Sequence, residues 1–135
     1  MNYPLTHIVG IDREMASRLK AAGVRSAGGL LATAFSPKGR RELAEKTGLG
    51  EKQILCWANL ADKLRVKGIG KEHAELLHAA GVETVRDLKY RNPANLAKAV
   101  AAANARRKLV RILPSEKAVQ RWIDNAKKLQ LKIKY

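Results

Sequence analysis

The sequence repeats itself at an offset of 58 residues, and this duplication constrains the fold more than any other feature. Residues 66–88, VKGIGKEHAELLHAAGVETVRDL, match residues 8–30, IVGIDREMASRLKAAGVRSAGGL, at ten of 23 positions. A chain duplicated in this way is expected to build two equivalent structural units. We therefore predict a first repeat over residues 1–64 and a second over residues 65–135.

The second half of each repeat is duplicated as well. Residues 49–64 match residues 114–129 at six of 16 positions, with an offset of 65, so the second repeat is seven residues longer. Trp57 and Trp122 coincide in this match. Apolar residues surround both at helical spacing, which favours core packing over a role as stacking platforms for bases.

Capping residues, glycines and prolines predict helices at the same places in both repeats. Asp12 can cap a helix over residues 13–22, which Gly23 would end, and residues 71–80 form the equivalent helix. Two further helices are predicted to open at Ser36-Pro37 and Asn92-Pro93. Alternation of apolar and polar residues is confined to the last seven residues, LQLKIKY, which we expect to be a frayed helix end or an extended tail. The fold class is therefore all-α, with both repeats in one compact helical domain.

Charge is the strongest feature of the composition, because 27 Lys and Arg residues oppose 12 Asp and Glu residues and leave a formal net charge of +15. Residues 92–135 contribute +9 of this surplus. It predicts a polyanionic partner: nucleic acid first, then an acidic membrane surface or an acidic protein. Solubility through net charge is the alternative.

The segment VKGIG, at residues 66–70, joins two predicted helices in the manner of a helix-hairpin-helix motif. Gly68 and Gly70 are expected to adopt backbone angles closed to other residues, and Ile69 between them to anchor the turn in the core. The amides at the start of the next helix, with the helix dipole, suit a phosphate oxygen. Lys67 and Lys71 can each add a charge contact. Such a site would not read base sequence, and the alternative is a tight connection that binds nothing.

Two acidic residues oppose anion binding at these turns. Glu72 lies in the first turn of the second hairpin's helix, where it repels an anion. In the first repeat Asp12 replaces the second glycine, so we interpret that hairpin as mainly structural. A further cationic group, interpreted as a phosphate-tracking patch or as a solvated face, lies in NARRKLVRIL and comprises Arg106, Arg107, Lys108 and Arg111.

The remaining residues offer little for catalysis. His73 and His78 are five residues apart, which does not place both on one helix face as a zinc pair requires. Cys56 is expected to be a buried thiol. No nucleophile–base arrangement, acidic metal cluster or phosphate-binding Gly-rich loop of an NTPase is visible, so we expect a non-enzymatic protein without metal or cofactor. We also expect no membrane span and no secretory signal, and hence a cytoplasmic location.

Several segments together resemble a known family: VGI at 9–11, LKAAGV at 19–24, and residues 47–70, 74–96 and 113–129. The pattern is similar to that of a bacterial family of tandem helix-hairpin-helix domains of unknown function, over nearly the whole chain. The resemblance implies the double-hairpin fold, and Asp12 departs from a binding hairpin. Our leading hypothesis is sequence-independent binding of nucleic acid, with duplex DNA favoured by analogy. The alternatives are a helical adaptor that docks an acidic protein and an accessory module that gives DNA affinity to a separate enzyme.

Overall fold

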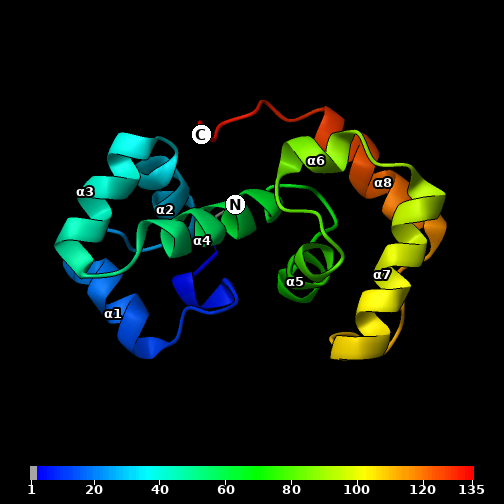
Figure 1. Cartoon of the computed structure of the whole chain (residues 1–135), viewed down its shortest axis with the longest axis horizontal. Coiled ribbons are helices and arrows are strands. Elements are labelled where there is room, and N and C mark those ends of the chain that lie inside the picture. The colour runs from blue at the N-terminus through cyan, green and yellow to red at the C-terminus, as the bar shows by residue number, and fades with distance from the viewer. Residues whose placement is uncertain (1–2) are drawn as a thin grey trace. The chain divides into compact units, whose positions relative to one another are not determined.

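The computed structural model describes residues 3–135, and its fold is all-α, as predicted (Figure 1). The helices of the first repeat are η1 (Leu5–His7, a 3-10 helix), α1 (Arg13–Ala21), α2 (Ala27–Ala34), α3 (Pro37–Thr47) and α4 (Glu51–Lys63). Those of the second repeat are α5 (Lys71–Ala79), α6 (Val85–Lys89), α7 (Pro93–Arg107) and α8 (Glu116–Lys127). In the described part of the chain no helix is long and apolar enough to cross a membrane.

Internal contacts divide the chain into two compact units. One unit comprises residues 1–62 and 132–135, and the other comprises residues 63–131. These units differ from the sequence repeats in two respects. The last four residues pack with the first repeat rather than with the second, and the boundary lies after residue 62 rather than after residue 64.

The same local signals shape the helices of both units. Ser26 caps α2 and Thr84 caps α6, each with a side-chain oxygen that accepts a backbone N–H three residues on. Gly23 and Gly81 follow α1 and α5 with φ of +92° and +94°, in the left-handed region where glycine is favoured. The predicted proline starts of α3 and α7 are confirmed by serine and asparagine caps.

Each unit buries a tryptophan in its core. Trp57 is 2% exposed and Trp122 is 4% exposed, which confirms the prediction that the two indoles pack inside rather than stack on a ligand. In the second unit α8 packs against α6 and α7, and α7 packs against α5. The prediction for Cys56 was wrong, because its side chain is only partly buried. It lies beside Trp57 on the helix and faces outward enough to contact solvent.

The C-terminal segment is an extended tail rather than a frayed helix. The backbone N–H of Lys134 donates to the carbonyl oxygen of Phe35 at 2.7 Å. The buried guanidinium of Arg40 donates to the carbonyl oxygens of Ala34 and Lys134, both at 2.9 Å. Tyr135 adds a hydrogen bond from its hydroxyl to Asn59 Oδ1 at 2.7 Å. Local periodicity does not encode these long-range partners, so the sequence could not place the tail.

Candidate nucleic-acid interface

The turn formed by residues 66–70, called here the second turn, is a tight bend anchored in the core. The Ile69 N–H donates to the Val66 carbonyl oxygen at 3.1 Å. Gly68 has a φ of +97°, as the third position of a type II turn requires. Val66 and Ile69 are both buried, so the two ends of the bend are held by apolar packing. The roles expected for Gly68 and Ile69 are thus confirmed.

One side of the second turn lies against α8. A Cβ placed on Gly68 would lie 3.3 Å from Cδ1 and Nε1 of Trp122, so the indole edge packs directly on the glycine. Asn125, one helical turn further on, donates from Nδ2 to the carbonyl oxygen of Lys67 at 3.0 Å. The His73 ring also packs on Trp122, with ring centroids 5.0 Å apart. Helix α8 therefore holds the turn in place through these three contacts.

Gly70, on the other side of the turn, differs from Gly68 in both its backbone conformation and its surroundings. Its φ of −99° and ψ of −170° are extended values that any residue adopts, so the expected need for special backbone angles was wrong here. A Cβ on Gly70 would meet nothing within 4 Å. It is the N-cap residue of α5, and no side chain makes a cap hydrogen bond there. Neither backbone geometry nor packing requires glycine at this position.

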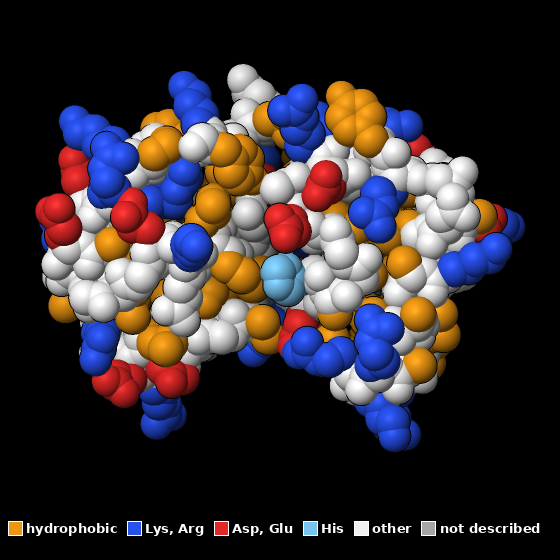
Figure 2. All heavy atoms as spheres, in the orientation of Figure 1, with side chains coloured by type: hydrophobic (Ala, Val, Ile, Leu, Met, Phe, Trp, Pro, Cys, Tyr) orange, Lys and Arg blue, Asp and Glu red, His pale blue; other side chains and the backbone are white. Residues whose placement is uncertain are grey.

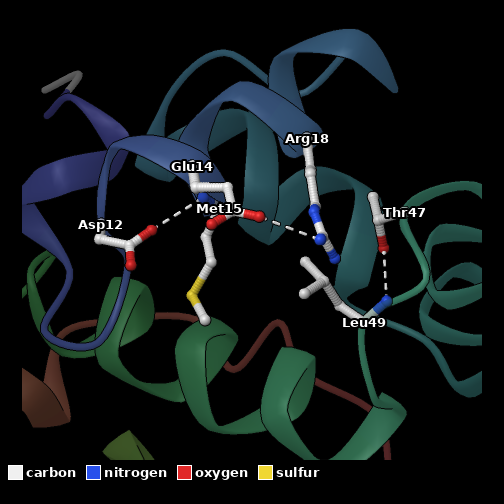
Figure 3. A network of polar contacts seen from close by, with 6 residues as sticks. All are labelled: Asp12, Glu14, Met15, Arg18, Thr47 and Leu49. Atoms are coloured by element: carbon white, nitrogen blue, oxygen red, sulfur yellow. Dashed lines mark hydrogen bonds and ion pairs between the residues drawn. The ribbon is translucent and has the colours of Figure 1, made fainter.

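The equivalent turn of the first repeat, residues 8–12, has the same glycine conformation and tryptophan contact. It differs at the N-cap residue, whose side chain makes a hydrogen bond; we call such a cap closed, and a cap without one open. Gly10 has a φ of +91°, and a Cβ on it would lie 3.1 Å from Trp57 Nε1. At the position of Gly70 stands Asp12, whose Oδ1 accepts from the backbone N–H of Met15 at 2.9 Å (Figure 3). This carboxylate occupies the place where an external anion would bind, as the sequence indicated.

The charged side chains near the second turn come from two elements. Lys67 is exposed and Lys71 half-buried, both at the turn itself, and Glu72 is exposed beside them. Arg121 of α8 and Lys128, the C-cap residue of α8, are exposed. They lie four residues before and three residues after Asn125, on the same helix face. Because Asn125 holds the turn, these two cations flank it. Neither cation could be predicted as part of the site from the sequence, since only the fold brings α8 to the turn.

The predicted cationic group of NARRKLVRIL lies elsewhere in the second unit. Arg106 and Arg107 form the last turn of α7, Lys108 is its C-cap, and Arg111 follows in the connection to α8. Arg107 is paired with Glu75 of α5 at 3.1 Å. Glu75 lies four residues after Lys71 on α5, about 6 Å along the helix axis at 1.5 Å per residue. The pair therefore holds Arg107 about one turn of α5 away from the second turn.

A third basic area was also missed. An open pocket of about 500 Å³ is lined by Lys89, Tyr90, Arg91 and Lys127. Tyr90 is 80% exposed, which leaves its ring available between cations. The run Lys-Tyr-Arg was a signal for it, since aromatic residues among cations suit single-stranded nucleic acid. Among the residues that the structure describes, no group of His, Cys, Asp and Glu could hold a metal ion.

Comparison with known proteins places the chain in a family. Residues 9–129 match the model described as Domain of unknown function (DUF4332), and the chain belongs to that family. No curated protein and no solved structure matches it significantly.

Proposed function

We propose that this protein is a non-enzymatic, sequence-independent binder of nucleic acid, with duplex DNA as the favoured ligand. The second turn supplies the main contact, in the manner of a helix-hairpin-helix motif. Backbone amides at the start of α5 receive a phosphate oxygen, helped by the positive end of the helix dipole. Lys67, Lys71, Arg121 and Lys128 add charge around it, and such contacts carry no base identity.

The observation that carries this proposal is the uncapped glycine at the start of α5. Gly70 has neither a conformational nor a steric reason to lack a side chain. In the other repeat the same position carries Asp12, which caps its own helix. Asp and Gly differ by only a few tenths of a kcal/mol as N-caps, so stability alone favours neither strongly. An open cap beside several cations is what an external anion needs.

The net charge gives the proposal its second support. A formal charge of +15 attracts a polyanion from a distance, and the exposed cations of the second unit continue the contact beyond the turn. The same charge would also attract an acidic protein, but an acidic surface offers carboxylates in no fixed repeat. A phosphate backbone supplies anions at regular intervals to several cationic areas at once.

A salt titration of binding to random duplex, single-stranded DNA and RNA tests the proposal. About four phosphate contacts predict a slope of log K against log salt of roughly −3 to −4 for duplex DNA. A slope near zero would contradict it. So would the purification, after nuclease treatment, of a stoichiometric acidic protein partner together with no affinity for random DNA, which would indicate the adaptor instead.

A further inference from the structure

The connection between α7 and α8 exposes two large aliphatic side chains at its tip. Ile112 is 85% exposed and Leu113 is 46% exposed. This connection, residues 108–115, is far longer than residues 48–50, which join α3 to α4 in the first repeat. We call residues 108–115 the tip loop. The longer connection of the second repeat therefore carries two apolar side chains that face solvent.

The tip loop is held in one conformation. Lys108 has a φ of +51°, the left-handed region that non-glycine residues seldom occupy, and its N–H donates to the Asn104 carbonyl oxygen at 2.7 Å. The Asn104 side chain then clamps Val110, donating to its carbonyl oxygen at 3.1 Å and accepting from its N–H at 3.0 Å. Ser115 closes the loop by capping α8. Ile112 and Leu113 thus project from an ordered support.

The support is also fixed to the body of the second unit. Arg107 pairs with Glu75, whose side chain is only 16% exposed. That pair uses one cation of the group structurally and leaves Arg106, Lys108 and Arg111 exposed around the tip. Figure 2 shows basic and apolar side chains close together over this end of α7. Two exposed aliphatic side chains and three exposed cations therefore share residues 106–113 of this unit.

A partner that fits this surface has anionic groups on its outside for the cations to contact. It also has an apolar interior shallow enough for Ile112 and Leu113 to reach. A nucleic-acid duplex has both, since phosphates flank a stack of bases, and isoleucine and leucine are among the residues that wedge between base steps. A lipid bilayer also has both. However, a single long acyl chain anchors a protein only marginally, so two side chains offer too little apolar surface.

We infer that the tip loop inserts Ile112 and Leu113 at a weakened base step of duplex DNA, such as a mismatch, while Arg106, Lys108 and Arg111 hold the flanking phosphates. This inference rests on the proposed function and adds the preferred DNA structure. A base step that is already unstacked costs less to open, so it binds more tightly than a matched step.

The test compares the affinities of the full chain for a matched duplex and for the same duplex with one central mismatch. Wild type is expected to favour the mismatch by about tenfold, because the cost of unstacking is then largely removed. The double variant Ile112→Ala, Leu113→Ala should lose this preference yet keep its affinity for matched duplex within about threefold, since the cations remain. Leu131→Ala, at another exposed leucine, is the matched control and should behave like wild type.

The outcomes separate the inference from the proposed function. The inference about the tip loop is overturned if wild type binds mismatched and matched duplex with equal affinity, or if the double variant keeps the preference for the mismatch. Salt-dependent binding to matched duplex would still support the proposed function in either case. If the wild-type protein does not bind duplex DNA at all, both the proposed function and the inference about the tip loop are overturned. Binding to vesicles of phosphatidylglycerol and phosphatidylcholine that the double variant loses would assign the tip to lipid and overturn the wedge.

Discussion

Asp12 and Gly70 occupy the same N-cap position in the two repeats, and only Asp12 accepts a hydrogen bond there with a side chain. Asp12 Oδ1 lies 2.9 Å from the Met15 nitrogen, whereas the N-cap of α5 has no side-chain hydrogen bond. The preceding glycines, the buried isoleucines and the tryptophan contacts are the same in both turns. One frame thus carries a closed and an open cap, and each can be converted into the other by a single substitution.

The first prediction is that Gly70→Asp closes the second turn. The new carboxylate should cap α5 and stabilise the protein by a few tenths of a kcal/mol, because the backbone at Gly70 accepts any residue without strain. It should also weaken duplex binding by about tenfold, or about 1.4 kcal/mol, through repulsion of phosphate. Fluorescence anisotropy and thermal unfolding measure the two effects.

Two controls accompany this substitution. Gly70→Asn adds a cap of similar size without charge and should weaken binding less than Gly70→Asp. Asp12→Asn removes a charge at the equivalent position, and affinity should stay within about twofold, because that turn binds no phosphate. Equal affinities for wild type and Gly70→Asp would remove the turn from the interface.

The second prediction concerns Glu72, the acidic residue in the first turn of α5. Its exposed carboxylate opposes a phosphate at the same helix end, so Glu72→Gln should tighten duplex binding by about two- to fivefold at low salt. The matched control is Glu14→Gln, at the same position of α1, where the carboxylate is paired with Arg18 at 3.1 Å. An equal gain from both variants would indicate a general effect of net charge rather than a local one.

The third prediction separates the two glycines of the second turn by stability. Gly68→Ala places a methyl group 3.3 Å from Trp122 and forces a residue with a side chain to a φ of +97°, which should cost about 1–2 kcal/mol. Gly70→Ala adds the same methyl group in open space, so it should cost only the N-cap preference for glycine over alanine, about 0.5 kcal/mol in the free energy of unfolding. Urea unfolding of the two variants gives the comparison, and equal losses would contradict the assigned conformations.

Much of this fold could be predicted because its signals are local. Gly23, Gly81 and the prolines after Ser36 and Asn92 fix helix ends through their own backbone chemistry. The role of Gly70 could not be predicted in the same way, since a glycine in the sequence does not reveal whether its φ is positive. Only the structure shows that Gly68 needs to be glycine and that Gly70 does not.

The candidate site was less predictable, because tertiary contacts assemble it. The hydrogen bond from Asn125 to Lys67 joins residues 58 positions apart, and together with the packing of Trp122 on Gly68 it brings the cations of α8 to the turn. The pair between Arg107 and Glu75 is likewise a tertiary contact, and it joins a predicted site residue to α5. A run of arginines in a sequence cannot show which members are already used by the protein itself.

The fourth prediction tests the contribution of α8 through the salt dependence of binding. Arg121→Gln with Lys128→Gln removes the two cations that flank Asn125, and the salt slope for duplex DNA should become shallower by about two, near one for each lost contact. The control is Lys46→Gln with Lys52→Gln, which makes the same change in net charge at exposed positions of the first unit. Its slope should stay close to that of wild type, because released counterions report local contacts rather than total charge. If both double variants flatten the slope equally, the cations of α8 have no special place at the turn, and binding follows the overall charge.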